Sequence, residues 1–240
     1  MVPAQLDSKR FPGKVLADIK GIPMLKRVLT QCNKAAPRKD IFVVTPDVKI
    51  YDLAGEWGYK CYMSGGKLPN GTVAIASIAE SLDCDYIVNI QSDHPVIPPD
   101  LIRAIVHNIV NLDADIVTPV YKITDHQDIG DYSVGKVVRD LNGWALYFSR
   151  SPIPCVRDVK YENWLDAFPY WGHYGIYGYK KEVLLKIDQL SESYLESAEG
   201  LEQLRFLQNG IKILTFETRY HQMSVDTARD IEKISRYIDV

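Results

Sequence analysis

The sequence DYIVNIQ at residues 85–91 is a short, mostly apolar run that is followed directly by the polar segment SDHP at residues 92–95. This pattern predicts a buried strand, and it is the strongest indication of the fold class. Two further runs of this kind are DIFVVT at residues 40–45 and DIVTPV at residues 115–120. Short apolar runs rich in Val and Ile are typical of strands that are buried on both faces of a parallel sheet.

Longer segments with a different period lie before and between these strands. Their apolar residues recur at three- and four-residue steps, as on amphipathic helices, at residues 23–35, 48–57, 72–81 and 100–112. Strands that alternate with helices predict βαβ units, and therefore an α/β fold built on a parallel sheet.

The pattern changes after about residue 120. Short runs at residues 134–139, 144–149 and 174–179 predict antiparallel strands, and Asn142-Gly143 predicts a hairpin between the first two. A final helix is expected at residues 228–238, with Asp226 and Thr227 as candidate caps. No linker rich in Gly and Ser separates the halves, so we expect one domain of 240 residues with an antiparallel extension of its sheet.

The composition is that of an ordinary globular protein, with 46% hydrophobic and 25% charged residues, which excludes disordered and collagenous chains. A net charge of −3 provides no basic field for nucleic acid or an anionic membrane, so we expect neither partner. Four cysteines without CxxC spacing favour reduced thiols over a disulfide framework or a zinc site. No apolar stretch reaches the ~18 residues of a membrane span and no signal-peptide pattern occurs, so a cytoplasmic location is expected.

Four common catalytic motifs do not occur: GxxxxGKS/T, GxGxxG, GxSxG and HExxH. The sequence therefore gives no support for a P-loop NTPase, a dinucleotide-dependent dehydrogenase, a nucleophile-elbow hydrolase or a zincin. The absence of these motifs does not exclude an enzyme that acts on phosphate groups.

The segment LDSKRFPGK at residues 6–14 places three cations around a Pro-Gly turn. A flexible turn with fixed positive charges can hold polyphosphate at the carboxyl end of a parallel sheet. Arg10 and Lys14 flank the turn and are the candidate phosphate-binding residues. A solvated basic loop explains the same residues equally well, because charged loops are common.

Two aspartates are candidate metal ligands. Asp93 follows the strand at residues 85–91, where ligands and their metals collect in open α/β sheets. Magnesium takes oxygen ligands and often only one or two protein carboxylates beside phosphates. Asp226 lies far along the chain in the segment SVDT, and the two carboxylates share one Mg²⁺ if the fold brings them together. A turn residue at Asp93 and a helix cap at Asp226 are the alternatives.

Three polar residues of the second half also have two interpretations. Arg150 ends a strand, where it either clamps a carboxylate or reaches solvent. A single His in a strand, such as His173, is more often a hydrogen-bonded structural residue than a catalyst. The segment EQLR at residues 202–205, which contains Gln203, is by default interpreted as the solvated face of a helix with local charge pairs.

Taken in order, these segments resemble the 3-deoxy-manno-octulosonate (Kdo) cytidylyltransferase family. The resemblance covers nearly the whole chain and rests on RFPGK (10–14), NGT (70–72), QSDHP (91–95), ALYFSR (145–150), GIYGY (175–179), LEQLR (201–205) and VDT (225–227). It implies an α/β fold of the nucleotide-diphospho-sugar transferase type, with a mixed, mostly parallel sheet flanked by helices and an antiparallel extension. It also implies a homodimer, with a nucleotide-binding half at about residues 1–120 and a sugar-acid-binding and dimerisation half at about residues 121–240.

The activity that the resemblance implies is transfer of CMP from CTP to the anomeric hydroxyl of Kdo or a related ulosonic acid, with release of pyrophosphate, for surface-glycan synthesis. Catalysis then consists mostly of positioning and charge neutralisation by Mg²⁺ and cations. The implied catalytic residues are Lys14, Arg10 and Asp93, and the implied Mg²⁺ ligands are Asp93 and Asp226. The implied nucleotide contacts are Arg10, Lys14, Asn70, Gly71, Thr72 and Gln91. The implied sugar-acid contacts are Arg150, His173, Tyr177 and Gln203, with Arg150 nearest the carboxylate.

The chain departs from the family pattern at four places. Gln5 and Ala74 stand where the family has arginines, Ser92 stands where it has glycine, and only Met1 precedes Val2 in a shortened first strand. Each lost phosphate contact weakens binding or transition-state stabilisation by ~1.5–3 kcal/mol. Lys9 or Lys67 is a candidate replacement cation, since both are near the altered loops in sequence. A cytidylyltransferase for a different 2-keto-3-deoxy sugar acid and a non-catalytic nucleotide-binding homologue are the alternatives.

Overall fold

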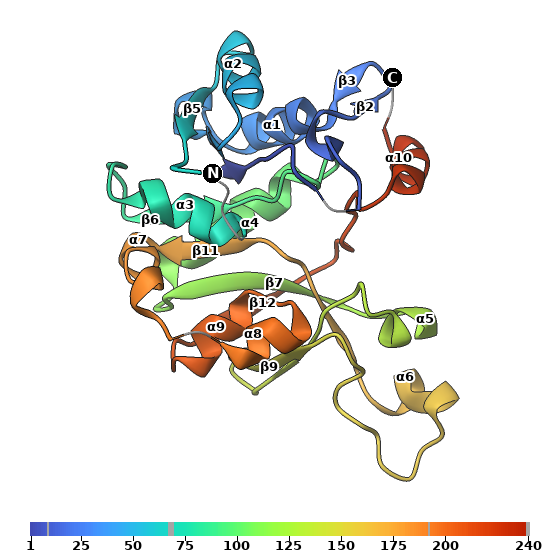
Figure 1. The fold of residues 1–240 in the computed structure, drawn as a ribbon. Helices are drawn as coiled ribbons and strands as arrows, with labels where there is room; N and C mark the ends of the chain where they lie inside the picture. Colours follow the sequence, from blue (N-terminus) through green and yellow to red (C-terminus); the bar gives the residue numbers. More distant parts are fainter. Residues whose placement is uncertain (9, 67–69, 192, 239–240) are drawn as a thin grey trace.

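The computed structural model describes residues 1–8, 10–66, 70–191 and 193–238. Lys9 and Lys67, the candidate replacement cations, lie outside these described residues. In Figure 1 the N-terminal part of the chain lies above the later strands, and a segment that carries helix α6 (Trp164–Ala167) projects from the lower right. None of the described helices is long and apolar enough to cross a membrane.

The N-terminal part of the sheet is parallel. Strand β1 (Val2–Pro3) pairs with β4 (Phe42–Thr45), and β4 pairs with β5 (Lys60–Met63). Two backbone hydrogen bonds, from Met1 N to Val88 O at 2.8 Å and from Ile90 N to Met1 O at 2.9 Å, continue the parallel pairing to β6 (Tyr86–Asn89). The carboxyl ends of β1 and β6 therefore open to the same edge of the sheet.

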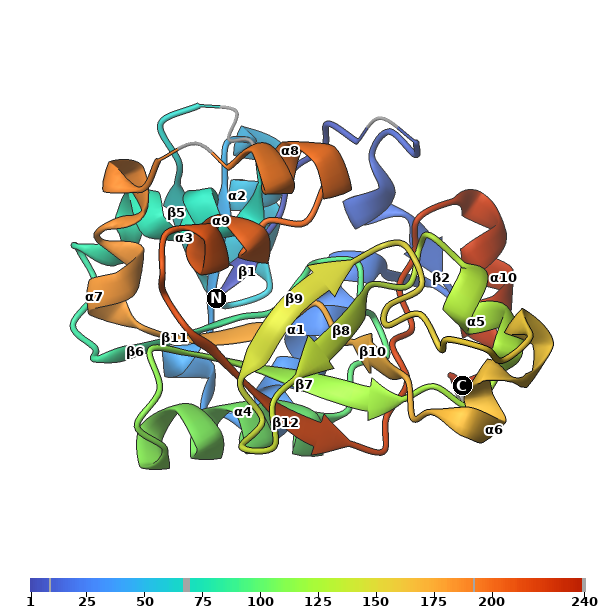
Figure 2. The ribbon, with the colours of Figure 1, turned by 90° about the horizontal axis from the view of Figure 1, so that it is seen from below.

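The remaining strands are joined mainly by antiparallel pairing, as Figure 2 shows for the strands around β7. Strand β11 (Tyr177–Lys180) pairs with β6 and β7 (Ile116–Lys122), and β10 (Trp171–His173) joins β7 to β8 (Lys136–Arg139). Strand β9 (Ala145–Ser149) forms the predicted hairpin with β8, while β12 (Ile213–Thr218) runs parallel to β7. The small strands β2 (Asp18–Ile19) and β3 (Ile22–Pro23) form a separate hairpin.

The predicted α/β class and the three predicted buried strands are confirmed. The antiparallel part is larger than expected, because β10 and β11 come from late in the chain and insert beside β7 and β6. The strand expected at residues 174–179 begins only at Tyr177: Tyr174 N instead donates to Pro119 O at 3.0 Å, and Ile176 N donates to Tyr174 O at 2.7 Å, which is a turn.

The four predicted helices of the first half are confirmed, and the predicted C-terminal helix ends at Ser235 rather than at residue 238. The longer helices are α1 (Met24–Ala35), α2 (Val48–Glu56), α3 (Gly71–Ala79), α4 (Pro99–Asn111) and α10 (Ala228–Ser235). The short ones are α5 (His126–Gly130), α7 (Lys181–Leu184), α8 (Tyr194–Glu199) and α9 (Gln203–Gln208). Single turns of 3-10 helix are η1 (Lys14–Leu16), η2 (Arg38–Asp40), η3 (Tyr161–Asn163) and η4 (Ile187–Gln189).

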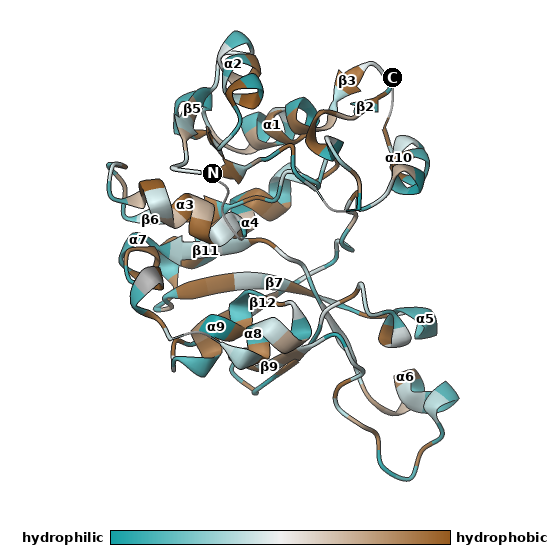
Figure 3. Ribbon diagram, in the orientation of Figure 1, coloured by the Kyte–Doolittle hydropathy of each residue, from teal (hydrophilic) through white to brown (hydrophobic). Residues whose placement is uncertain are grey.

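The core lies where the apolar stripes of the helices pack on the sheet. Helix α1 buries Met24, Leu25, Val28, Leu29 and Cys32, and helix α4 buries Leu101, Ile102, Ile105 and Ile109. Strand β7 is buried over six of its seven residues, and Figure 3 shows apolar residues along it. Burial on both faces explains why β7 has a continuous apolar pattern in the sequence.

Candidate active site

Two cavities meet at the carboxyl edge of the parallel strands. The first has a volume of about 650 Å³ and is lined by the loop after β1, by Lys14 and by the ends of β4 and β6. The second has a volume of about 900 Å³ and extends toward β10, α8 and α9. Asn70, Gly71 and Gln91 line both, so the two cavities form one continuous cleft. Volumes of this order suit nucleotide-sized and sugar-sized ligands.

A cluster of opposite charges lies between the two cavities. Lys14 Nζ donates to Asp93 Oδ2 at 2.7 Å and lies 3.5 Å from Asp226 Oδ1. Arg10 Nη2 donates to the same Asp226 oxygen at 2.7 Å. The structure thus brings together four of the charged residues that the sequence singled out, although Arg10 and Asp226 are 216 positions apart in the chain.

Local structure holds each member of this cluster. Gly13 has a left-handed backbone with φ of 73°, which lets the loop turn directly before Lys14. The backbone N–H of Val225 donates to Asp93 O at 2.9 Å, which ties the segment before Asp226 to the end of β6. Thr227 then starts α10 with a capping box, so the expected cap is confirmed at Thr227, while Asp226 points its carboxylate at Lys14 and Arg10.

The cluster keeps Asp93 ionised. Burial raises the pKa of Asp93, but the charges of His94 and Lys14 and the hydrogen bond from Lys14 outweigh it, so the pKa lies below its ordinary value of 3.8. His94 is buried, with its Nε2 3.5 Å from Asp93 Oδ1, and burial lowers its pKa. Its Nδ1 has no hydrogen-bond partner within the part of the chain that the structure describes.

The donor set at this point fits a divalent cation that also binds phosphate. Asp93 and Asp226 both direct a carboxylate oxygen at one positive group, the ammonium of Lys14. Among the described residues, no group of three or more His, Cys, Asp or Glu side chains could hold a metal ion. Two carboxylates leave most positions of an octahedral Mg²⁺ to water and phosphate oxygens, as is usual for this ion.

Asn70 and Gly71 shape the passage between the cavities. Asn70 caps α3, its Oδ1 accepting from Val73 N at 2.9 Å. A side chain at Gly71 would place its Cβ 2.8 Å from Pro3 Cγ and 3.3 Å from Gln91 Oε1, so any larger residue would force these neighbours to shift. Gln91 and Asn70 remain candidates for nucleotide contact.

Thr72, in contrast, lies below the cleft and lines neither cavity. Its side chain is buried, with its Oγ1 3.2 Å from Tyr179 Oη and accepting from Asn89 Nδ2 at 3.3 Å. The Thr72 hydroxyl is therefore already engaged by neighbouring side chains, Glu202 included, and a contact of the turn at residues 70–72 with nucleotide stays a prediction.

The candidate sugar-acid residues form a hydrogen-bonded chain at the floor of the second cavity. Tyr177 Oη donates to Gln203 Oε1 at 3.0 Å, and Gln203 Nε2 lies 3.4 Å from His173 Nδ1. His173 Nε2 lies 2.9 Å from Thr118 Oγ1, which donates to Ile176 O at 2.8 Å. Since Thr118 donates onward, the neutral ring carries its proton on Nε2 and accepts from Gln203 at Nδ1.

His173 is held in its neutral form. Burial lowers its pKa to about 3. It therefore acts as a polar neutral group and not as a cation at neutral pH. Gln203 keeps one Nε2 hydrogen unused by these bonds, which leaves it able to donate into the cavity.

Arg150 spans the edge of the second cavity. Its Nε donates to Glu199 O at 2.8 Å, its Nη2 to Gly200 O at 3.2 Å and its Nη1 to Tyr132 O at 2.8 Å. A guanidinium has five N–H donors, so two remain for a ligand. Arg150 is thus both a connection between two backbone segments and a candidate carboxylate-binding group.

Several residues that line the second cavity were not among the predicted site residues, among them Tyr132, Ser133, Glu202, Gln222 and Ser224. The sequence interpreted residues 202–205 as a solvated helix face, but Glu202 lies at the second cavity and Gln203 is buried. Burial raises the pKa of Glu202 to about 7, although the hydroxyl and backbone N–H of Thr72 lower it. The left-handed Gly200, which ends α8 directly before this segment, is the one local signal of a turn into the cleft.

The two positions at which the expected family arginines are missing both line the first cavity, as does Ser92, a third departure from the expected pattern. Gln5 and Ala74 are among its lining residues. Within the described lining, Lys14 is the single Lys or Arg, so the lost positive charges have no substitute among the described residues of this cavity.

Comparisons with known proteins found relatives that match nearly the whole chain. The model of the cytidylyltransferase family matches residues 1–213. The 3-deoxy-manno-octulosonate cytidylyltransferase of Geotalea uraniireducens (strain Rf4) is 39% identical over 241 residues, which cover 98% of this chain and 96% of the relative. The enzyme of the same name from Solibacter usitatus (strain Ellin6076) is 39% identical over 238 residues, covering 98% and 92% of the two chains.

Solved structures extend the similarity to the fold. A CMP:2-keto-3-deoxy-manno-octonic acid synthetase complexed with CTP has a TM-score of 0.89 and 33% identity, and the match covers 98% of this chain and 95% of that one. A cytidylyltransferase from Leptospira borgpetersenii has a TM-score of 0.64 at 15% identity, covering 100% and 86%, and so shares the fold alone. These neighbours confirm the predicted fold class.

Proposed function

The chain belongs to the 3-deoxy-manno-octulosonate cytidylyltransferase family, and we propose that it transfers CMP from CTP to the anomeric hydroxyl of Kdo and releases pyrophosphate. The observation that carries the proposal is the meeting of Arg10 and Lys14 with Asp93 and Asp226 at the junction of two continuous cavities. Phosphoryl-transfer catalysis requires cations and metal-binding carboxylates at the point where two substrates meet.

In the proposed reaction, CTP lies in the first cavity and the sugar acid lies in the second. The anomeric oxygen of Kdo forms a bond to the α-phosphorus of CTP, and the bond from that phosphorus to the β-phosphate oxygen breaks. The hydroxyl proton passes to water in the cleft, and the negative charge moves to the leaving pyrophosphate. Lys14 and Arg10 neutralise that charge, which is the main contribution a protein makes to this chemistry.

We propose that Asp93 and Asp226 hold Mg²⁺. A divalent ion at this point supplies charge neutralisation on the phosphate oxygens and orients the triphosphate. The low pKa of Asp93 keeps its carboxylate available as an oxygen ligand. Lys14, which contacts both carboxylates, is long enough to exchange one of them for a phosphate oxygen.

The proposed sugar-acid contacts are Arg150, His173, Tyr177 and Gln203. Arg150 has two unused N–H donors for the carboxylate, and Gln203 has one for a hydroxyl. The neutral His173 and Tyr177 fix the orientation of Gln203 rather than adding charge. We assign nucleotide binding to the half at residues 1–120 and sugar-acid binding to the half at residues 121–240.

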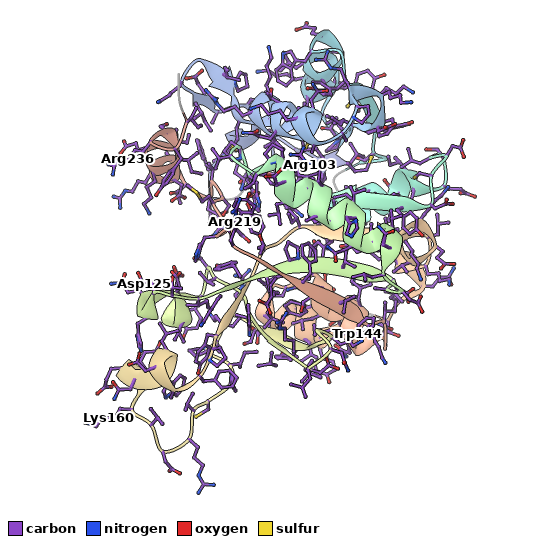
Figure 4. All side chains as sticks on the ribbon, turned by 180° about the vertical axis from the view of Figure 1, so that it is seen from behind. Arg103, Asp125, Trp144, Lys160, Arg219 and Arg236 are labelled. Atoms are coloured by element: carbon purple, nitrogen blue, oxygen red, sulfur yellow. The ribbon has the colours of Figure 1, made fainter. Side chains whose placement is uncertain are left out.

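We also propose that the protein is a homodimer that acts in the cytoplasm, where CTP is available. The projecting segment between β9 and β10 is the part of the second half best placed for an interface, and Figure 4 shows Lys160 near its outer end. This segment exposes two large aromatic side chains, Tyr161 at 40% and Phe168 at 38%. Light scattering on the purified protein tests the dimer, and a monomer mass at micromolar concentration contradicts it.

Pyrophosphate release from CTP, Kdo and Mg²⁺ tests the activity. We expect turnover in the wild-type protein and in Asp113→Ala, a control whose carboxylate is fully exposed, and none in Asp93→Ala. Removal of Mg²⁺ with EDTA should stop turnover, and added Mg²⁺ should restore it. Wild-type turnover only with another ulosonic acid corrects the substrate, while CTP binding without turnover on any acid favours a non-catalytic homologue.

A further inference from the structure

Two backbone segments from different parts of the chain form walls of the second cavity. One wall is the loop at residues 131–135, which contributes Tyr132, Ser133 and Gly135 to the lining. The other is the turn after α8, which contributes residues 200–203. Neither wall belongs to a long helix or strand, so something else must hold their spacing.

A buried lysine below the first wall binds it from inside. Lys136 begins β8, is 0% exposed and lines neither of the two cavities. Its Nζ donates to Asp131 O at 2.8 Å and to Val134 O at 2.6 Å. Within the described residues, no carboxylate oxygen forms an ion pair with this ammonium within 4.0 Å. Its charge is therefore directed entirely at two backbone carbonyls of the loop.

The loop is connected onward to both the opposite wall and the sugar-acid residues. Arg150 donates to Tyr132 O on this wall and to Glu199 O and Gly200 O on the other. The backbone N–H of His173 donates to Gly135 O at 2.8 Å. A shift of the loop would therefore move Arg150 and the strand that carries His173 together.

Resting on the proposed function, we propose that Lys136 is a positioning residue for the sugar acid: its buried ammonium holds the loop at residues 131–135 in the shape that places Arg150 and His173 around the substrate. Lys136 does not touch the substrate on this proposal. The role is unlike that of an ordinary core residue, because an apolar side chain of the same length would fill the space and leave Asp131 O and Val134 O without these donors.

The charges around Lys136 make this device sensitive to pH. Burial and the charge of Arg150, which directly follows β9, lower the pKa of Lys136 to about 8, although Asp131 in the loop, Asp128 on α5 and Glu199 on α8 raise it. Above that pH the amine is neutral and donates weaker hydrogen bonds to the loop. The KM for Kdo should therefore rise as the pH passes through about 8.

Two measurements test the proposal with Lys136→Met, which keeps the length of the side chain but has no donor. Hydrogen exchange of the free protein should show faster exchange for the amides of residues 131–135, with α1 unchanged as an internal reference. Steady-state kinetics should show a KM for Kdo about tenfold higher, the scale of one lost hydrogen bond, with the KM for CTP unchanged. The pH dependence of the KM for Kdo near pH 8 should disappear in the variant.

Lys180→Met is the matched control, since Lys180 lies at the far end of the sheet and pairs with Asp115 at 3.1 Å. It should leave both the exchange of residues 131–135 and the KM for Kdo at wild-type values. Equal rises in the two KM values, or loop exchange at the wild-type rate in Lys136→Met, overturn the proposal. The exchange experiment needs no substrate, so an inactive wild-type protein would refute the proposed function and still leave the holding role of Lys136 open to measurement.

Discussion

Replacing Glu202 with Gln should stabilise the free protein at neutral and alkaline pH and change its stability little near pH 5. Glu202 lies at the second cavity, where burial raises the pKa of its carboxyl group from 4.5 to about 7. Thr72 lowers that pKa only in part, through its hydroxyl and its backbone N–H. The charged form of Glu202 is therefore disfavoured in the folded protein relative to the unfolded chain.

The sign and size of the effect follow from proton linkage. Between pH 4.5 and about 7 the folded protein binds this proton while the unfolded chain has released it, so the free energy of unfolding falls as the pH rises. Above pH 7 the loss is complete and amounts to about 3 kcal/mol from the difference between the two pKa values. Gln carries no charge and keeps an oxygen that can accept from Thr72, so the variant avoids this loss.

Urea unfolding of the substrate-free protein at about pH 5, 7 and 8.5 measures the effect. The gain in unfolding free energy of Glu202→Gln over wild type should grow from about 1 kcal/mol or less at pH 5 to about 3 kcal/mol at pH 8.5. Glu182→Gln, at an exposed position, is the control and should show no such growth. A gain that is the same at all three pH values, or a loss at pH 8.5, would refute the buried-carboxylate reasoning.

Three further predictions concern the cleft. Lys14→Met should lower kcat/KM for pyrophosphate release by about a hundredfold or more. The substitution removes a charge-assisted phosphate contact and leaves the carboxylates of Asp93 and Asp226 facing each other. Activity within tenfold of wild type would contradict this prediction. Gly71→Ala should lower the free energy of unfolding by about 1–3 kcal/mol, since the new Cβ meets Pro3 Cγ at 2.8 Å, and unchanged thermal unfolding would show that the strand yields easily. Ala74→Arg should tighten CTP binding in calorimetry by adding a cation to the first cavity, whereas equal or weaker binding would show that other residues already supply the charge.

Local sequence patterns determined most of the fold. The apolar runs that became β4, β6 and β7, and the three- and four-residue periods that became α1 to α4, are properties of short segments that each bury one face or both. The partners of β10 and β11 were not predictable in this way, because strand pairing between residues 85–122 and 171–180 depends on which edges the rest of the chain leaves open.

The candidate site likewise combines residues that the sequence singled out with residues whose burial only the fold determines. The sequence singled out Arg10, Lys14, Asp93 and Asp226 as candidates, with a solvated loop, a turn and a helix cap as the alternatives. Their roles in a site were implied by the resemblance to the cytidylyltransferase family. Only the tertiary structure decided that Thr72 and Lys136 are buried, and that Glu202 lies partly buried at the second cavity. Burial of a charged side chain comes from elements far away in the chain, so no neighbouring residue signals it, and its consequence for charge and hydrogen bonding appears only when those elements pack together.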